Sequence, residues 1–288
     1  MLKKRAKLLS VLAVMIVLMI VFVNYQNNHI VISKISLNAD VDASFKIVQI
    51  SDLHSKQFGK SNKKLEEKIT GLSPDFIVFT GDIIDGSGKN IDETLDFIST
   101  LDKNAPVICI FGNHEWRSGL QDDIEKKMKD KSICILRNEI KTLDVLSNRV
   151  NILGLDENQG SYNDYIAMQQ GEFEYRDNKT LFDELSKLDG YNIVLSHYPE
   201  NFALAGGHSY NQFDFDIMFS GHAHGGQFVL PFIGGVYAPG QGFNPPYYKG
   251  LYDNRLIVSS GLGNSMFPLR LFNYPEIVEI SILKNTVK

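Results

Sequence analysis

The chain of 288 residues is expected to form an α/β fold behind an N-terminal transmembrane helix. Short apolar runs rich in β-branched and aromatic residues have the pattern of strands buried on both faces. Amphipathic segments with helical spacing lie between them. Strand, polar residues and helix recur about every thirty residues, the length of a βαβ unit. With 43% hydrophobic residues, such a chain can bury a large single core.

The first thirty residues have the composition of a signal anchor. Basic residues at positions 3, 4, 5 and 7 precede an apolar run over residues 8–23 that a single serine interrupts. No small-x-small cleavage site follows, so an uncleaved anchor is favoured over a cleaved signal peptide. The run is slightly short for a spanning helix, and Tyr25 could extend it as an interfacial anchor. The basic cluster would stay in the cytoplasm, which predicts a single-pass cell-membrane protein with its remaining residues outside the cytoplasm.

Beyond the anchor, strands and helices are expected to alternate. Residues 30–44 have mixed polarity and fit an edge strand or a tether. Strands are predicted from the apolar runs at residues 45–50, 76–79, 106–111, 133–136, 141–146, 149–155, 191–196, 215–220, 256–260 and 276–283. Helices are predicted from apolar residues at helical spacing at residues 60–70, 91–101, 118–130 and 180–188. Residues 158–178 are polar, like an inserted excursion or lid. Residues 228–248, rich in glycine, proline and aromatics, fit a substrate-facing or membrane-facing loop and equally well a packed structural loop.

Charge and cysteine content narrow the class of protein. The net charge of −5 lacks the basic footprint of a nucleic-acid-binding domain, so no nucleic-acid binding is expected. Cys109 and Cys134 lie inside apolar strand-like runs. Buried free thiols are therefore favoured over a single disulfide, and there is no Cys-x-x-Cys metal pattern.

Polar residues of metal-ligand type follow the predicted strands at the points where they end. Thr80 and Gly81 end the run that starts at residue 76, Asp82 comes directly after them, and Asp85 follows in the same loop. Because the carboxyl ends of parallel strands meet at one edge of a sheet, these residues are expected to converge. Five of the seven histidines occupy such positions. The full candidate set is Asp52, His54, Asp82, Asp85, Asn113, His114, His197, His222 and His224.

This order of motifs resembles the calcineurin-like metallophosphoesterase superfamily, and within it the branch of bacterial membrane-anchored or exported phosphodiesterases. The motifs are Asp-x-His at residues 52–54, Gly-Asp-x-x-Asp at 81–85, Gly-Asn-His-Glu at 112–115, the later His197, and Gly-His-x-His at 221–224. The resemblance implies a four-layer α/β/β/α sandwich of two mixed sheets. It divides the chain into a basic tip and anchor helix (1–29), a tether or edge strand (30–44) and a metallophosphoesterase domain (45–288).

The resemblance also implies two divalent metal ions that share one carboxylate. Asp52, His54, Asp82 and His224 would hold one ion, and Asp82, Asn113, His197 and His222 would hold the other, with Asp82 as the bridge. Mixed nitrogen and oxygen ligands suit Mn, Fe or Zn better than calcium, which prefers oxygen ligands alone. The sequence leaves the choice among the three metals open.

The implied activity is a binuclear metal-dependent phosphoesterase, in the first place a phosphodiesterase, acting by in-line attack of a metal-bridging hydroxide. His114 would contact the phosphoryl oxygen or protonate the leaving group, and Asp85 would orient His114. Some relatives carry an arginine directly after this aspartate, where the present chain has Gly86. Arg117 and Arg270 are then the candidates to bind the substrate phosphate. The alternative for each is an ion pair at the protein surface.

Two alternatives to the phosphodiesterase remain open at this stage. The first is a phosphomonoesterase or pyrophosphatase that acts on a lipid-linked or nucleotide-linked head group, which the membrane anchor motivates. The second is a metal-stabilised scaffold without turnover. His114 and Asp85 argue against the scaffold, because neither is needed to hold metal. A phosphoester substrate, which includes one linked to lipid or to the cell envelope, is the expected partner in both enzymatic interpretations.

Overall fold

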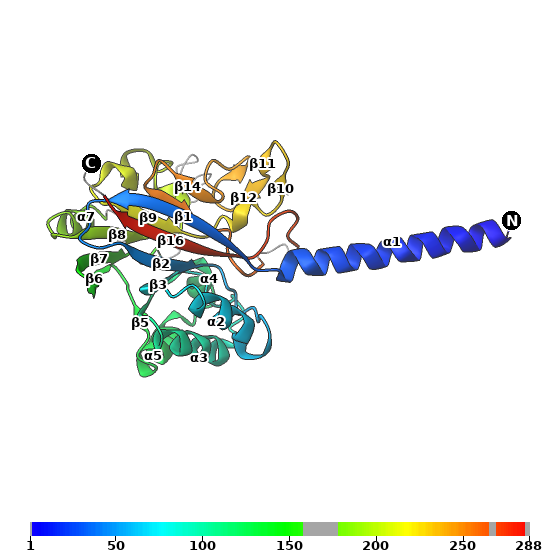
Figure 1. Ribbon diagram of the computed structural model, residues 1–288, viewed down its shortest axis with the longest axis horizontal. Helices are drawn as coiled ribbons and strands as arrows, with labels where there is room; N and C mark the ends of the chain where they lie inside the picture. The colour runs from blue at the N-terminus through cyan, green and yellow to red at the C-terminus, as the bar shows by residue number, and fades with distance from the viewer. Residues whose placement is uncertain (1, 158–177, 265–268, 286–288) are drawn as a thin grey trace.

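The computed structural model describes residues 2–157, 178–264 and 269–285. Two six-stranded mixed sheets lie face to face (Figure 1). In order across the first sheet are β1 (Val31–Ala39), β16 (Glu276–Lys284), β2 (Phe45–Ile50), β3 (Phe76–Thr80), β4 (Val107–Ile110) and β5 (Cys134–Ile135). In order across the second are β14 (Gly250–Tyr252), β15 (Leu256–Val258), β9 (Ile217–Ser220), β8 (Tyr191–Leu195), β7 (Asn148–Gly154) and β6 (Glu139–Val145).

Helices cover the outer face of each sheet, which confirms the four-layer α/β/β/α sandwich. The strand β3 shows how the layers form, because its residues are buried on both faces. Ile77 and Phe79 pack with the core under the helices, and Phe76 and Val78 pack with the core between the sheets. The helices over the first sheet are α2 (Lys63–Thr70), α3 (Ile91–Asp102) and α5 (Gln121–Asp130). The helix α7 (Lys179–Leu185) packs Phe182 and Leu185 on the second sheet.

Several short elements differ from the predicted boundaries. The segment 118–130 begins its helix only at Gln121, because Asn113–Arg117 already forms the short helix α4 and Gly119 between them has a φ of 70°. Within residues 228–248, four two-residue strands form two small hairpins, β10 (Val229–Leu230) with β11 (Gly234–Gly235), and β12 (Tyr237–Ala238) with β13 (Gly242–Phe243). Cys109 is buried, Cys134 is partly buried, and both are free thiols, as predicted. The expected excursion at residues 158–178 lies outside the described residues except for Asn178.

The strand β1 forms one edge of the first sheet. It pairs in parallel with β16 along its whole length, from Val31 opposite Glu276 to Ala39 opposite Lys284. Of the two possibilities for this part of the chain, the structure therefore shows an edge strand. The strand begins three residues after the end of the helix α1 (Leu2–Asn28).

Strand directions place the carboxyl ends of β2, β3 and β4 at the end of the sandwich from which α1 leaves. The strand β1 starts at α1 and runs away from it, and β16 is parallel to β1. Because β2 is antiparallel to β16, it runs back toward α1. The strands β3 and β4 are parallel to β2 and end at the same side (Figure 1).

The last turn of α1 is bound to the globular part of the chain. Gln26 is buried, donates from Nε2 to the Tyr274 hydroxyl at 2.8 Å, and accepts the backbone N–H of Phe272 at 3.1 Å. The Asn27 Oδ1 atom accepts the backbone N–H of Arg270 at 3.1 Å. The apolar side chains of the preceding turns are exposed. Residues 4–28 are long and apolar enough to cross a membrane, a property that a signal sequence shares.

Candidate metal centre

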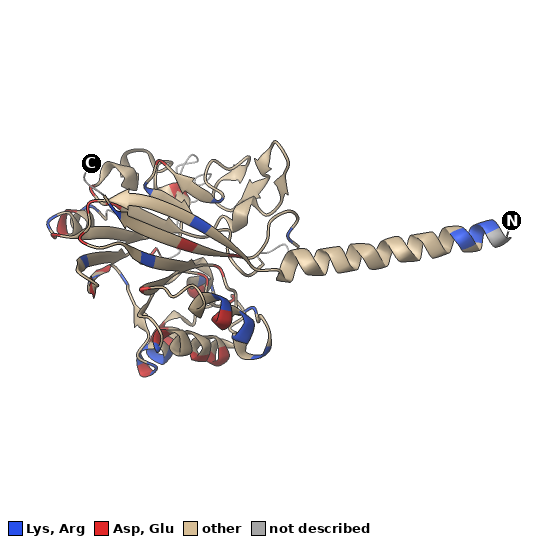
Figure 2. Ribbon diagram, viewed as in Figure 1, with Lys and Arg blue, Asp and Glu red and all other residues tan. Residues whose placement is uncertain are grey.

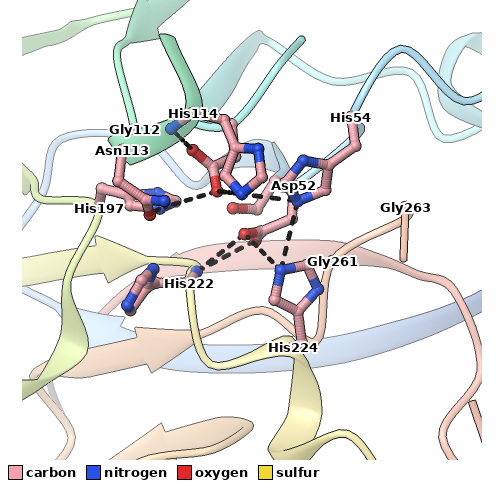
Figure 3. Close-up of polar contacts among 12 residues, drawn as sticks. Asp52, His54, Gly112, Asn113, His114, His197, His222, His224, Gly261 and Gly263 are labelled. Carbon is pink, nitrogen blue, oxygen red and sulfur yellow. Dashed lines mark hydrogen bonds and ion pairs between the residues drawn. The ribbon is translucent and has the colours of Figure 1, made fainter. Parts of the chain in front are cut away.

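The candidate ligands lie in the loops that follow the buried strands, at the α1 end of the two sheets. Asp52 and His54 follow β2, and Asp82 follows β3. Asn113 follows β4, His197 follows β8, and His222 and His224 follow β9. Figure 3 shows the labelled members of this set gathered in one place at the ends of both sheets.

Five of these residues have a left-handed backbone conformation, which residues other than glycine rarely adopt. The φ angles are 49° at Asp52, 49° at His54, 51° at Asp82, 64° at His222 and 46° at His224. Such strained residues gather at functional sites, where the surrounding structure holds them in place. Here the strained residues are the same ones whose donor atoms come together at the strand ends.

The first group of donor atoms consists of Asp52, His54, Asp82 and His224. One ligand atom from each lies within 4.8 Å of the others, and all four side chains are buried. His224 Nε2 is 3.5 Å from Asp52 Oδ1, and His54 Nε2 is 3.7 Å from Asp82 Oδ2. The two Nε2 atoms of His54 and His224 are 3.3 Å apart. Two imidazole nitrogens this close, beside two carboxylates, form a suitable cage for one cation.

The second group consists of Asp82, His197 and His222, whose ligand atoms also lie within 4.8 Å of one another. His197 Nε2 is 3.4 Å from Asp82 Oδ2 and 3.2 Å from Asn113 Oδ1. Asp82 is therefore common to both groups, as a bridging ligand must be. All seven residues proposed as ligands come together in this arrangement.

Burial and charge in these groups fit divalent cations. Burial lowers the pKa of His54 to about 4 and moves the pKa values of His222 and His224 well below the usual range, so these rings are neutral donors. Burial raises the pKa of Asp52 to about 6, and the nearby Asp82 carboxylate adds to the rise. His197 differs, because burial disfavours its charged form but the Asp82 carboxylate outweighs burial and raises the pKa of His197 to about 10. Buried carboxylates facing each other need positive charge, which a divalent cation would supply in place of a protonated His197, and neutral imidazoles have lone pairs to share. The donor set thus fits divalent metal ions with mixed nitrogen and oxygen ligands.

Hydrogen bonds behind the ligands fix their orientation. His197 Nδ1 is 2.7 Å from the Thr80 carbonyl oxygen, so its Nε2 faces Asp82. The backbone N–H of His197 donates to Glu157 Oε2 at 2.8 Å, and the backbone N–H of His222 donates to Asp52 Oδ1 at 3.1 Å. Contacts of this kind hold metal ligands in the correct rotamer and tautomer.

Three buried glutamates were missed as site residues by the sequence analysis. Glu115 accepts the backbone N–H groups of Asp82, Ile84 and Gly112, and burial raises its pKa to about 8. Glu157 supports the His197 loop, and Glu200 Oε1 lies 3.9 Å from His222 Nε2. Each lies a few residues after the end of a strand. Selecting polar residues that follow predicted strands, which identified the ligands, would therefore also have identified these glutamates.

His114 lies beside the two groups, and its surroundings differ from the prediction. Its Nε2 is 4.0 Å from Asp82 Oδ2, and its ring contacts the His54 ring at 4.4 Å between centroids. Its Nδ1 accepts the backbone N–H of Gly86 at 3.2 Å. Asp85 instead accepts the backbone N–H and the hydroxyl of Ser87. In this structure Gly86, and not Asp85, contacts the His114 ring, and the orienting role of Asp85 stays a prediction.

Arg270 also differs from the prediction, because it is neither a surface residue nor available to substrate. Its side chain is buried and donates to the carbonyl oxygens of Ser260 at 2.8 Å and Gly263 at 3.1 Å. Burial lowers its pKa to about 10. Arg117 is exposed at the end of α4, close enough to lower the pKa of His222, so it remains the candidate for contacting phosphate.

Comparison with known proteins decides the family. A model of the calcineurin-like phosphoesterase family matches residues 45–226. The chain belongs to this family. The uncharacterized metallophosphoesterase YkuE of Bacillus subtilis (strain 168) is 30% identical to this phosphoesterase over 251 residues, 84% of this chain and 80% of the relative.

Two further relatives of this phosphoesterase carry activities in their names. The UDP-2,3-diacylglucosamine pyrophosphatase LpxG of Chlamydia trachomatis serovar D is 29% identical over 280 residues, which cover 80% of this chain and 74% of the relative. The phosphodiesterase YaeI of Escherichia coli (strain K12) is 24% identical over 252 residues, which cover 85% of this chain and 84% of the relative. The phosphoesterase is thus a hydrolase that acts on phosphoester bonds, and its family uses divalent metals.

Proposed function

We propose that this phosphoesterase is a two-metal phosphodiesterase that α1 anchors in the cell membrane, with the catalytic sandwich outside the cytoplasm. Asp52, His54, Asp82 and His224 would hold one ion, and Asp82, Asn113, His197 and His222 the other, with Mn, Fe or Zn as the fitting metals. When bound, the pair of cations would neutralise phosphoryl oxygens and make water a stronger nucleophile at neutral pH.

The observation that carries the proposal is the position of His114. Because its Nδ1 accepts the Gly86 N–H, a neutral ring carries its proton on Nε2. Nε2 faces Asp82 at 4.0 Å, on the border of both ligand groups. Its side chain keeps 22% of its surface exposed, whereas the Asp82 side chain keeps 2%. His114 can therefore reach a substrate and donate a hydrogen bond from Nε2 to the oxygen that leaves phosphorus, stabilising the charge that develops there.

The position of the site supports a second candidate, a pyrophosphatase acting on a lipid-linked head group. The backbone N–H of Gly263 donates to the Asp52 carbonyl oxygen at 2.6 Å, and Arg270 joins Gly263 to Asn27 at the end of α1. The metal centre therefore lies a few residues from the proposed membrane span. The relative named as a UDP-2,3-diacylglucosamine pyrophosphatase agrees with a lipid-linked substrate.

A substrate panel tests both candidates. The purified full chain, loaded with Mn²⁺, is given an aryl phosphodiester, an aryl phosphomonoester and a lipid-linked pyrophosphate in mixed micelles. A phosphodiesterase would hydrolyse the diester at least about tenfold faster than the monoester. Preference for the monoester would contradict the proposal, and fastest cleavage of the lipid-linked pyrophosphate would select the second candidate. The H114Q protein serves as the control for contaminating activity.

A further inference from the structure

Residues 228–248, which we call the aromatic lobe, form an uncharged surface feature beside the metal centre. The lobe contains no Asp, Glu, Lys or Arg, whereas about a quarter of the residues of an average soluble domain are charged. Its two hairpins, β10–β11 and β12–β13, carry no coloured charge in Figure 2. A segment of this length without charge is unusual on a water-exposed surface.

Large apolar side chains are exposed on both hairpins of the lobe, Phe232 and Ile233 in the β10–β11 turn and Phe243 in β13. Phe232 is fully exposed, at 109% of its reference surface, and Phe243 and Ile233 are exposed at 80% and 64%. Phe232 also has a φ of 67°, a strained conformation for a bulky residue. An apolar cluster that is held out of the core in this way marks an interaction surface.

The lobe is attached to the end of α1. The backbone N–H of Val229 donates to the Leu271 carbonyl oxygen at 3.1 Å, and the next residue, Phe272, places its ring 6.1 Å from the ring of Phe22 in α1. Figures 1 and 2 show β10, β11 and β12 on the side of the sandwich from which α1 leaves. A bilayer that holds α1 would therefore lie against the lobe.

We propose that the aromatic lobe inserts Phe232, Ile233 and Phe243 into the bilayer that α1 spans. The proposal rests on the anchoring proposed above. A lipid surface is favoured over a protein partner because the lobe offers no charge for specific pairing and lies beside the span. Aromatic rings and the half-exposed Tyr237 suit the boundary between head groups and acyl chains.

Insertion of the lobe would place the metal centre at the membrane surface. The lobe continues directly from the loop that carries His224, since the backbone N–H of Val236 donates to the Gly226 carbonyl oxygen at 3.0 Å. Gly226 and Gly235 are packed so closely that a side chain at Gly226 would lie 2.4 Å from the Gly235 Cα. The depth to which the lobe inserts into the bilayer thus sets the distance of His224 from the membrane surface. This arrangement favours a substrate whose phosphoester sits in a lipid head group.

Tryptophan fluorescence in vesicles tests the insertion. The chain has one tryptophan, Trp116, so W116F provides a background free of tryptophan. In that background, full-chain F232W and F243W proteins are reconstituted into phosphatidylcholine vesicles with brominated acyl chains. The brominated chains are expected to reduce the tryptophan emission of both proteins about twofold. The same reduction is expected for an I16W protein, whose tryptophan lies within α1. L146W is the matched control, because Leu146 is also exposed, at 67%, but lies in the β6–β7 turn at the other end of the sandwich.

The outcomes separate this proposal from the anchoring. If I16W is quenched while F232W and F243W match L146W, the lobe does not insert although the anchor stands. If I16W is not quenched, anchoring fails and the lobe proposal fails with it. Blue-shifted emission without bromine quenching would mean that a protein, such as a second copy of the chain, covers the lobe, which also overturns the proposal.

A kinetic experiment gives an independent readout. The F232S/F243S double variant should hydrolyse a water-soluble aryl phosphodiester at the rate of the unaltered chain. Toward a phosphodiester carried on a lipid head group in vesicles, its kcat/KM should fall about tenfold, because α1 alone would no longer hold the metal centre in register with the head groups. Equal loss on both substrates would show damage to the fold, and no loss on either would contradict the proposed role in substrate access.

Discussion

His114 is the residue whose replacement tells most about the chemistry. The H114Q protein keeps every proposed ligand, so its metal content should match that of the unaltered chain. Its kcat should fall about 10²–10⁴-fold, the usual contribution of a general acid. The loss should be larger for an alkyl than for a nitrophenyl leaving group, because a good leaving group needs little protonation. Metal analysis and kinetics on both substrates check this prediction.

Asp85 provides the matched comparison for His114. Its carboxylate accepts hydrogen bonds from Ser87, and Gly86 makes the contact with the His114 ring. A D85N protein should therefore retain activity to within about threefold, since amide oxygen can accept the same bonds. A loss as large as that of H114Q would show that Asp85 acts on His114 after all, and would restore the role predicted from the motif.

Lys56 makes the stability of the protein depend on pH. Burial lowers its pKa from 10.5 to about 7, and the nearby Arg270 guanidinium adds to the shift. Between pH 7 and pH 10.5 the unfolded chain binds more protons at this lysine than the folded chain, so its contribution to the free energy of unfolding rises with pH. Melting temperatures of the full chain should rise from pH 7 to pH 9 relative to those of K56M. Parallel curves for the two proteins would contradict the prediction.

At the level of elements, the loops after β4 and β9 depend on the absence of a side chain at two glycines. A Cβ on Gly221 would lie 1.8 Å from Ser51 Oγ and 2.4 Å from Asp52 Oδ2, and one on Gly112 would lie 2.3 Å from Asp82 Oδ1. G221A should displace Asp52 and weaken metal binding at least about tenfold in titration calorimetry. G207A is the control, because nothing lies within 4 Å of a Cβ there, and binding as tight in G221A as in G207A would refute the argument.

The strands and their ligands could be predicted because their signal is local. A run such as residues 76–79 is apolar throughout, which only burial on both faces explains, and parallel strands bring Asp52, Asp82 and Asn113 to one edge. Arg270 could not be predicted in the same way. Its burial depends on carbonyl oxygens at Ser260 and Gly263 that meet it only in the folded chain. The short hairpins at residues 229–243 also escaped prediction, since two-residue strands show no periodicity.

At the scale of the whole molecule, one end of the sandwich combines the proposed anchor, the aromatic lobe and the metal centre. The strand β1 runs away from α1 and the next strand, β2, runs back, so a single reversal of direction returns the chain to the α1 end before the first ligand, Asp52. Gln26, buried at 2% exposure, keeps the helix joined to the loop at Tyr274. The fold therefore places the metal centre and the end of α1 at the same end of the sandwich.

Removal of metal should abolish activity without unfolding the protein, because the three apolar cores do not include the ligands. The core between the sheets, for example, is built from residues such as Ile47, Val78, Ile193 and Phe219. A chelator should eliminate hydrolysis and leave the far-ultraviolet circular dichroism unchanged, and Mn²⁺ should restore activity. The melting temperature should fall on metal removal, since ligand at about 100 times its Kd adds about 2.7 kcal/mol to the free energy of unfolding. Loss of secondary structure in the chelated protein would mean that the buried carboxylates Asp52 and Asp82 cannot be tolerated without cations, and that the metals are structural as well as catalytic.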